Sequence, residues 1–132
     1  MHRAVTALLG PTNTGKTHLA IALGVEATKQ KRRVLFTRAA DLVRQLIEAR
    51  DARELTRLLL VDELSLGLAP IVVEQLLPVL RQVADDTGIG VLLVEQHVAL
   101  ALEIADRAYL LQRGQVAWTG SAAELADRPD LL

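Results

Sequence analysis

The sequence predicts an α/β fold in which helices cover both faces of a largely parallel β-sheet. Two observations lead to this fold class. Short apolar runs alternate along the chain with longer amphipathic stretches, which is typical of strands joined by helical crossovers. The runs are apolar throughout, as expected of strands that are buried on both faces. Right-handed crossover connections then determine the hand of the sheet.

The length and composition fit one domain with an aliphatic core. The chain has 132 residues, of which 51% are hydrophobic and only 2% aromatic, so Leu, Val, Ala and Ile must build the core. We expect residues 1–132 to form a single domain. The absence of Cys excludes disulfides and thiolate metal sites. Because no apolar run reaches transmembrane length and no signal-peptide pattern is present, we expect a soluble cytoplasmic protein that does not enter membranes by itself.

Six strands are predicted, four of them from continuous apolar runs. The four runs cover residues 4–9, 33–37, 58–62 and 91–95. The last two strands, at residues 108–112 and 115–119, flank the dipeptide Arg113-Gly114, which is a two-residue hairpin signal. We therefore expect the chain to add an antiparallel hairpin to its parallel strands.

Helices are predicted between the strands from apolar residues at helical spacing. They cover residues 16–30, 40–53, 71–84 and 98–105, with a last short helix after residue 121. Pro70 suits the first turn of the third helix, whereas Pro78 lies inside it and should kink it or force a local adjustment. Ser121, followed three residues later by Glu124, predicts a capping box at the start of the last helix.

The segment GPTNTGKT fits the pattern G-x-x-x-x-G-K-[ST] of phosphate-binding loops and lies between a predicted strand and a predicted helix. Its glycines allow close backbone approach to phosphates, and the helix N-terminus points its amides at the anion. We expect Lys16 to reach the β- and γ-phosphates and Thr17 to ligate Mg²⁺. A glycine turn followed by an ordinary surface lysine is the alternative. The candidate nucleotide-binding residues are Gly10, Pro11, Thr12, Asn13, Thr14, Gly15, Lys16, Thr17 and His18.

A carboxylate pair ends the third predicted strand, at Asp62 and Glu63. In open α/β sheets ligands bind at the carboxyl ends of the strands. We expect Asp62 to hold the Mg²⁺ shell and Glu63 to act as the catalytic base that orients or deprotonates an attacking water. The alternative is a pair of solvated charges at the end of a strand.

A third polar group, Glu95-Gln96-His97, follows the fourth predicted strand. If that strand lies between the first and the third, its end faces the γ-phosphate of a bound nucleotide. We therefore assign Gln96 to nucleotide binding and His97 to catalysis. The alternative is that one of these two side chains merely caps the following helix.

Charge is distributed unevenly along the chain, although the net charge is only −1. Residues 1–57 contain 11 Lys or Arg and 5 Asp or Glu, whereas residues 58–132 contain 4 and 11. Such an asymmetry can mark a nucleic-acid surface. The run KQKRR at residues 29–33 is the best local candidate, with a solvated turn after a helix as the alternative reading.

Three segments resemble three different families of nucleotide-binding proteins. Residues 1–20, with AVTALLGPTNTGKTHLAI, resemble the nucleotide-binding motif of superfamily-2 RNA helicases. Residues 17–64 resemble IstB/DnaC-like AAA+ ATPases, which help insertion-sequence transposition and load helicases. Residues 58–132, from LLLVDE onward, are similar to the C-terminal part of ABC ATPase subunits of branched-chain amino-acid importers.

These resemblances imply one fold. All three families are P-loop NTPases with an additional strand between the phosphate-loop strand and the acidic strand. The resemblance implies a three-layer α/β/α P-loop NTPase sandwich with a parallel core of strand order 5-1-4-3-2 and an antiparallel edge hairpin. It also matches His97 to the ABC switch histidine and residues 65–69 to the loop after the acidic pair.

The change of family near Leu64 suggests that the chain was assembled from different sources. The ABC pattern has Pro at this position, whereas the AAA+ pattern has Leu. We interpret this mosaic, and the opposite charges of the two halves, as the mark of an engineered chimera or a minimal designed P-loop domain.

Several parts of the complete ATPases have no counterpart in this sequence. The ABC helical subdomain, LSGGQ signature and glutamine loop are absent, as are the AAA+ lid and arginine finger. We therefore expect binding of ATP, or of GTP, with Mg²⁺ and weak or no hydrolysis. A folded scaffold without nucleotide function and a nucleic-acid-binding ATPase fragment are the alternatives. The strand edge at residues 33–37 leaves homo-oligomerisation open.

Overall fold

A six-stranded sheet runs through the molecule in the order β2-β3-β4-β1-β5-β6. The computed structural model describes residues 5–11, 14–38, 41, 58–63, 65 and 68–132. The strands are β1 Val5–Leu9, β2 Val34–Arg38, β3 Leu58–Asp62, β4 Gly90–Glu95, β5 Arg107–Gln112 and β6 Gln115–Ser121. All neighbours pair in parallel except β5 and β6. This topology confirms the core order 5-1-4-3-2 and the antiparallel edge hairpin.

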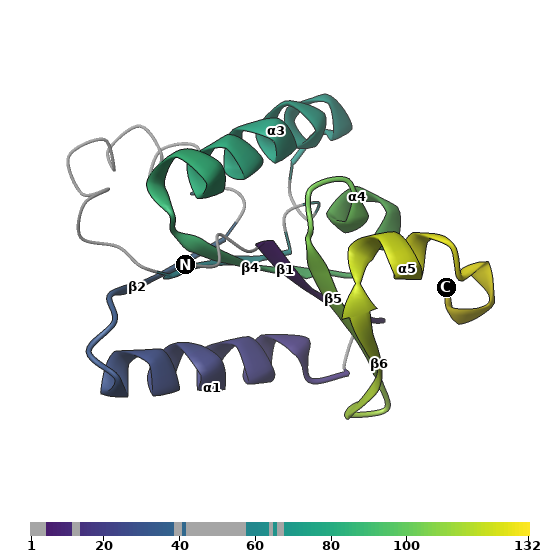
Figure 1. Ribbon diagram of the computed structural model, residues 1–132, viewed down its shortest axis with the longest axis horizontal. Coiled ribbons are helices and arrows are strands. Elements are labelled where there is room, and N and C mark those ends of the chain that lie inside the picture. Colours follow the sequence, from purple (N-terminus) through teal and green to yellow (C-terminus); the bar gives the residue numbers. More distant parts are fainter. Residues whose placement is uncertain (1–4, 12–13, 39–40, 42–57, 64, 66–67) are drawn as a thin grey trace.

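Helices lie on both faces of the sheet, as predicted (Figure 1). The described ones are α1 Lys16–Lys29, α3 Pro70–Thr87, α4 Val98–Leu102, α5 Ala122–Ala126 and the 3-10 turn η1 Pro129–Leu131. Of these, only α1 covers one face, and α3, α4 and α5 share the other. The helix predicted over residues 40–53 falls outside the described residues except for residue 41. No described helix combines the length and apolar character needed to cross a bilayer.

The strand register aligns three strand ends at one edge of the sheet. Leu9 of β1 pairs with Glu95 of β4, and Asp62 of β3 pairs with Val94. The loop after β1, the acidic pair after β3 and the polar residues after β4 therefore meet at the carboxyl edge. This is the arrangement that the position of β4, between β1 and β3, was expected to produce.

The two faces of the sheet bury two aliphatic cores. Successive side chains of a strand point to opposite faces, so Leu8 of β1 packs toward α1, whereas Val5 and Leu9 pack toward α3. The larger core, on the α3 side, includes Val5, Ala7, Leu9, Leu59, Val61, Leu77, Leu80, Leu93, Ala108 and Leu125. The smaller core, under α1, includes Leu8, Ala20, Leu60, Leu92, Val94 and Leu111.

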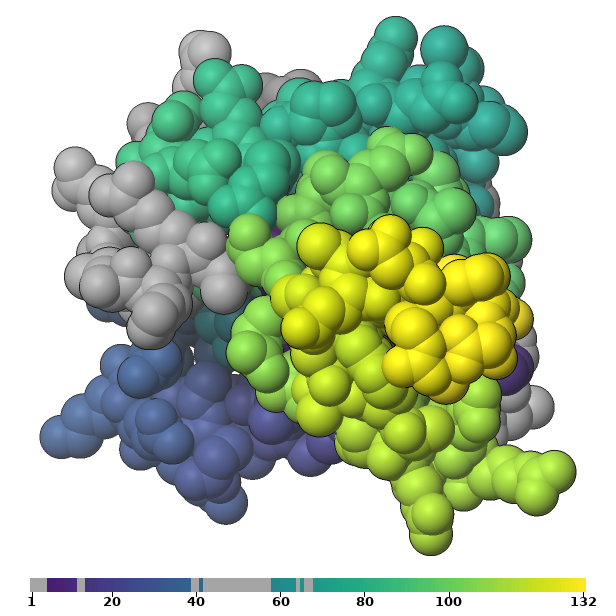
Figure 2. Space-filling view, turned by 45° about the vertical axis from the view of Figure 1, so that its right-hand side comes forward, coloured from purple at the N-terminus to yellow at the C-terminus, as the bar shows by residue number. Residues whose placement is uncertain are grey.

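Local signals explain where most helices begin. Pro70 is at the first position of α3, and the helix continues through Pro78. The capping box predicted for α5 is present, because Ser121 Oγ accepts from the Glu124 amide and Glu124 Oε2 accepts from the Ser121 amide, each over 3.1 Å. Figure 2 shows α5 and the C-terminal turn, in yellow, beside the green α4, with which α5 is in contact.

Helix α4 is shorter than predicted and ends at Leu102 rather than at residue 105. The Asp106 amide donates to the Val5 carbonyl over 2.7 Å, which brings the chain into line with β1. Pairing with the sheet thus overrides the helical pattern in the last residues of the predicted helix.

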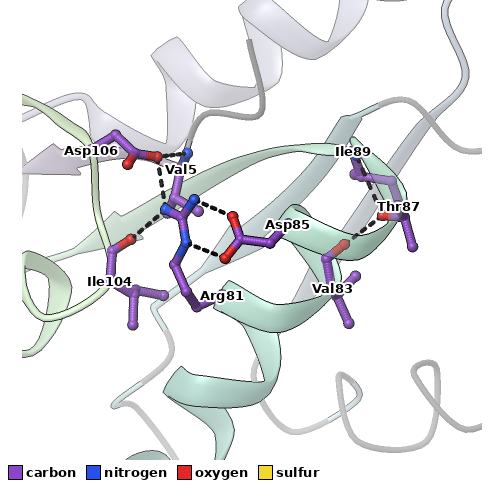
Figure 3. A network of polar contacts seen from close by, with 8 residues as sticks. All are labelled: Val5, Arg81, Val83, Asp85, Thr87, Ile89, Ile104 and Asp106. Atoms are coloured by element: carbon purple, nitrogen blue, oxygen red, sulfur yellow. Dashed lines mark hydrogen bonds and ion pairs between the residues drawn. The ribbon is translucent and has the colours of Figure 1, made fainter. Parts of the chain in front are cut away.

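A polar network around Arg81 of α3 connects this helix to the sheet (Figure 3). Its Nη1 donates to Asp106 Oδ2 over 2.7 Å and to the Ile104 carbonyl over 3.1 Å. Its Nε and Nη2 donate to the carboxylate of Asp85. The hydrogen bonds that Arg81 donates to Asp85 first, and then to Asp106, raise the pKa of Arg81 above its ordinary value. Asp106 Oδ2 also accepts from the Val5 amide over 2.8 Å. The carboxylate of Asp106, immediately before β5, thus binds both α3 and β1.

Candidate functional site

The segment after β1 wraps around a buried lysine. Gly10 has φ 154° and Gly15 has φ 88°, which are backbone conformations that favour glycine. A Cβ at Gly10 would lie 2.3 Å from the Leu111 carbonyl oxygen, so this position admits no side chain without a shift of the backbone. Lys16 is only 4% exposed, and its Nζ donates to the Pro11 carbonyl over 2.7 Å. The loop therefore curves over the side chain that follows it.

The buried ammonium of Lys16 lacks an anionic partner within the described part of the chain. The same Pro11 carbonyl accepts a second hydrogen bond, from Thr14 Oγ1 over 2.9 Å. An ammonium group has three N–H donors, and Pro11 takes one of them. Because burying a charge without an opposite charge is unfavourable, this arrangement suits an anion placed against the loop.

Helix α1 adds its positive end to the same place. It is 14 residues long, starts directly at Lys16, and has no side-chain cap and no acidic residue in its first turn. The amides of a first helical turn lack partners inside the helix, and the helix dipole favours negative charge there. The first amides of α1 can therefore donate hydrogen bonds to the oxygens of an anion.

A hydroxyl and a carboxylate meet beside this loop. Thr17 Oγ1 donates to Asp62 Oδ1 over 3.1 Å, and both residues are partly buried. No group of three or more His, Cys, Asp or Glu occurs among the described residues. Mg²⁺ does not need such a group, because it is usually held by one or two carboxylates together with phosphate oxygens and waters. The Thr17–Asp62 pair therefore fits Mg²⁺ bound with a nucleotide.

Glu63, next to Asp62, turns the chain away from the strand. Its φ is 49°, in the left-handed region that side chains disfavour, and its amide donates to the Val94 carbonyl over 2.8 Å. Strained backbone of this kind is frequent at functional sites. The Glu63 side chain is partly exposed at the carboxyl edge of the sheet.

The residues after β4 line a hollow beside the phosphate loop. This hollow of about 450 Å³ is lined by Gly10, Pro11, Gln96, His97, Val98, Leu110, Gln112, Leu131 and Leu132. The structure thus brings Gln96 and His97 to the loop, as the sequence predicted. His97 precedes the first residue of α4, yet its side chain makes no capping hydrogen bond. The alternative reading of His97 as a simple helix cap is therefore not observed.

Sequence reasoning named Glu95 without giving it a role, and it did not identify Leu131 or Leu132 at this edge. Glu95 is 1% exposed, and its carboxylate accepts hydrogen bonds from Ser65 and from the His97 amide. Leu131 and Leu132 reach the hollow from the C-terminus. No motif marks either contact, because each depends on how distant segments pack together.

Three of the predicted site residues, Thr12, Asn13 and His18, stay predictions. Thr12 and Asn13 lie outside the described residues. His18 is exposed on α1, one residue beyond the Thr17 side chain. Its placement supplies no contact that supports a role in nucleotide binding.

The basic run at residues 29–33 forms an exposed turn at the end of α1. Lys29 lies 3.4 Å from Glu26, and Lys31 adopts φ 60° as the chain leaves the helix. This geometry agrees with the alternative reading of a solvated turn. Nothing in the described residues around it favours a nucleic-acid surface.

A second hollow, of about 570 Å³, lies between α1 and the sheet. It is lined by Thr6, Leu8, Leu19, Leu23, Leu58, Gly90, Val91, Leu92, Tyr109 and Val116. These residues offer no charged group to an anion.

Comparisons with known proteins give two kinds of similarity. The model of the family described as IstB-like ATP binding protein matches residues 2–76. The insertion sequence IS21 putative ATP-binding protein of Pseudomonas aeruginosa is 50% identical over 50 residues, which cover 38% of this chain and 19% of that protein.

The second similarity is to transport ATPases. The high-affinity branched-chain amino acid transport ATP-binding protein BraG of Pseudomonas aeruginosa PAO1 is 44% identical over 73 residues, which cover 55% of this chain and 31% of BraG. The chain therefore spans less than a third of the length of either curated relative.

A solved structure with the same fold is that of cbiO1 from Clostridium perfringens, part of the ABC transporter complex cbiONQ. It superposes with a TM-score of 0.77 over 98% of this chain and 81% of cbiO1, at 14% sequence identity. The chain thus has an ABC ATPase-like P-loop NTPase fold, with similarity to fragments of both ABC ATPases and the IS21 protein.

Proposed function

Because the chain belongs to the family of IstB-like ATP-binding proteins, we propose that it binds ATP with Mg²⁺ at the loop of residues 10–17. One observation carries the proposal: Lys16 is buried at the start of α1 without an anionic partner in the described residues. The phosphates of a nucleotide would supply the missing negative charge. The ATP-binding descriptions of the two curated relatives support ATP over GTP.

Each group at the carboxyl edge has a role in this proposal. The first amides of α1 and the Lys16 ammonium bind phosphate oxygens, and the Thr17 hydroxyl and Asp62 carboxylate hold Mg²⁺. When bound, Mg²⁺ would neutralise phosphate charge. Glu63 orients or deprotonates a water, and Gln96 and His97 face the terminal phosphate across the hollow.

We propose that hydrolysis is weak. The sequence has no identifiable arginine finger, and such a residue contributes about 10³–10⁵ to the rate in P-loop enzymes. The ABC helical subdomain and LSGGQ signature, which would help to exclude water from the site, have no counterpart in the sequence. Binding requires only the loop, the helix end and the Thr17–Asp62 pair, so it should survive these losses.

The two similarities also support our interpretation that the chain is an engineered chimera of two P-loop proteins. In such a chain the phosphate loop and the acidic strand need not share an origin. The 3.1 Å contact between Thr17 and Asp62 then decides whether the joined halves form a working site. If the contact is misplaced by about 1 Å in solution, the chain is a folded scaffold without nucleotide function.

Calorimetric titration of ATP with Mg²⁺ tests the proposal. We expect the wild type to bind, and Lys16→Ala to lose at least about tenfold in affinity, because it removes a charged hydrogen-bonding group. Lys29→Ala is the matched control, since it removes a lysine from the exposed end of the same helix. Equal affinities for wild type and Lys16→Ala would refute binding through this loop, and no binding by either would establish the scaffold alternative instead.

A further inference from the structure

A buried carboxylate joins the two segments that carry Glu63 and His97. Glu95, the last residue of β4, is 1% exposed. Its Oε1 accepts from the amide and the hydroxyl of Ser65, each over 2.8 Å, and its Oε2 accepts from the Ser65 hydroxyl over 3.0 Å. Oε2 also accepts from the His97 amide over 2.8 Å.

These contacts make Glu95 an acceptor on both of its oxygens. A buried carboxylate is tolerated only when hydrogen bonds replace its hydration. Ser65 and His97 supply those bonds. The Glu95 carboxylate therefore couples the position of the segment after β3 to that of the segment after β4. Hydrogen bonds to an ionised acceptor are shorter and stronger than neutral ones, which makes this coupling stiff.

The end of β4 also holds Glu63, which is two residues before Ser65. The Glu63 amide donates to the carbonyl of Val94, the residue before Glu95. Glu63 is therefore anchored through its own backbone and, two residues later, through Ser65. Its left-handed backbone conformation, with φ 49°, persists because both sides of the turn are attached to β4.

We propose that Glu95 is a positioning residue, which holds Glu63 and His97 in one fixed arrangement toward the terminal phosphate. This inference rests on the proposed nucleotide site and deepens it. Glu95 itself touches no phosphate in this arrangement, because its two oxygens face Ser65 and His97. Glu95 contributes to the preference of the site for a triphosphate over a diphosphate, because only the terminal phosphate of the triphosphate reaches the segments of Glu63 and His97.

Replacement of Glu95 by Gln isolates this role. Gln has nearly the same shape, but one of its two terminal atoms is an NH₂ donor. That donor must face either the Ser65 amide or the His97 amide, and both of these are donors as well. Glu95→Gln should therefore release one segment without opening a cavity. Glu103→Gln is the matched control, because Glu103 is exposed at the end of α4.

The experiment measures two properties of the full chain for wild type, Glu95→Gln and Glu103→Gln. The first is amide hydrogen exchange at Ser65 and His97, followed by NMR. The second is the ratio of the Kd for ADP to the Kd for ATP, both with Mg²⁺. We expect Glu95→Gln to speed exchange at one or both amides and to lower the ratio by about tenfold, with the ADP affinity unchanged.

The outcomes separate this inference from the proposed function. Unchanged exchange at both amides overturns the coupling, whether or not nucleotide binds. An equal loss of ATP and ADP affinity shows that Glu95 only supports the fold, and overturns its positioning role. A wild type that binds neither nucleotide refutes the proposed function itself, and the positioning role with it.

A second variant keeps the test decisive if Glu95→Gln does not fold. Ser65→Ala removes the hydroxyl contacts but keeps the Ser65 amide and the Glu95 carboxylate. It should lower the ratio of the two dissociation constants in the same direction, by less than Glu95→Gln. An unchanged ratio in a folded Ser65→Ala protein would contradict the proposal.

Discussion

The hydroxyl of Thr17 on α1 donates a hydrogen bond to Oδ1 of Asp62 at the end of β3, over 3.1 Å. Strand β4 lies between β3 and β1, the strand that the loop follows, so the contact crosses the carboxyl edge through side chains alone. It places side by side the two oxygens to which we assign Mg²⁺ binding.

Loss of the Thr17 hydroxyl or of the Asp62 charge should abolish the dependence of nucleotide binding on Mg²⁺. Thr17→Val keeps the shape and loses the hydroxyl, and Asp62→Asn loses the charge. For both variants we expect the Kd for ATP to be the same in Mg²⁺ and in EDTA, whereas the wild type binds more tightly in Mg²⁺. Calorimetry in the two buffers checks this. Thr28→Val, on the exposed side of α1, is the control and should retain the Mg²⁺ effect.

Gly10→Ala should destabilise the protein more than Gly114→Ala. Both glycines have positive φ, but a Cβ at Gly10 lies 2.3 Å from the Leu111 carbonyl, whereas one at Gly114 has open space. The backbone conformation alone costs Gly114→Ala about 1–2 kcal/mol, and the clash adds to this at Gly10. Urea denaturation measures the difference, and equal losses would show that the loop adapts without strain.

Arg81→Met should lower the free energy of unfolding by about 1 kcal/mol. The side chain is 28% exposed, so its ion pairs with Asp85 and Asp106 are screened by solvent, and only the combined network is expected to contribute measurably. Arg128→Met is the control, because Arg128 pairs with Asp130 at the surface, where the two side chains are 50% and 59% exposed. We expect no measurable change in the free energy of unfolding for Arg128→Met. An equal loss of unfolding free energy in both variants would refute the contribution of the network around Arg81.

Lys31→Gly should raise the melting temperature. Lys31 has φ 60° after α1, where the Arg32 amide returns to the Ala27 carbonyl over 3.0 Å in a Schellman-type ending. Glycine adopts this conformation without the penalty of about 1 kcal/mol or more that a side chain incurs. Lys29→Gly, inside the helix, should lower the melting temperature instead. Calorimetric scans of both variants test the sign of each effect.

The sequence predicted the layered architecture because its signals are local. Apolar runs mark buried strands, and the capping box at Ser121 needs only its own side chain and that of Glu124. The phosphate loop is equally local, since its two glycines and Lys16 lie within seven residues. The strand order came from the resemblance to P-loop NTPases, and the register then brought Asp62 and Gln96 to the same edge.

Other features depend on packing between distant segments and could not be predicted. The left-handed turn at Glu63 requires the carbonyl of Val94, and the role of Glu95 requires Ser65. A Glu at the end of a strand gives no sign of which loop it will bind. The end of α4 was misplaced for the same reason, because the pairing of Asp106 with Val5 outweighs helical periodicity.

The central position of β1 has a consequence for folding kinetics. Val5 pairs with Val91, and Thr6 pairs with Arg107, so the first strand acquires its neighbours only from the last third of the chain. Such high contact order slows folding. The long chain segment between β1 and β4 must lose conformational entropy before the strand pairing can stabilise the sheet. During synthesis, β1 must wait until β4 and β5 have left the ribosome. Neither half of the chain is then an independent folding unit, whatever the origin of each half. A cut between β3 and β4 should leave two unfolded fragments.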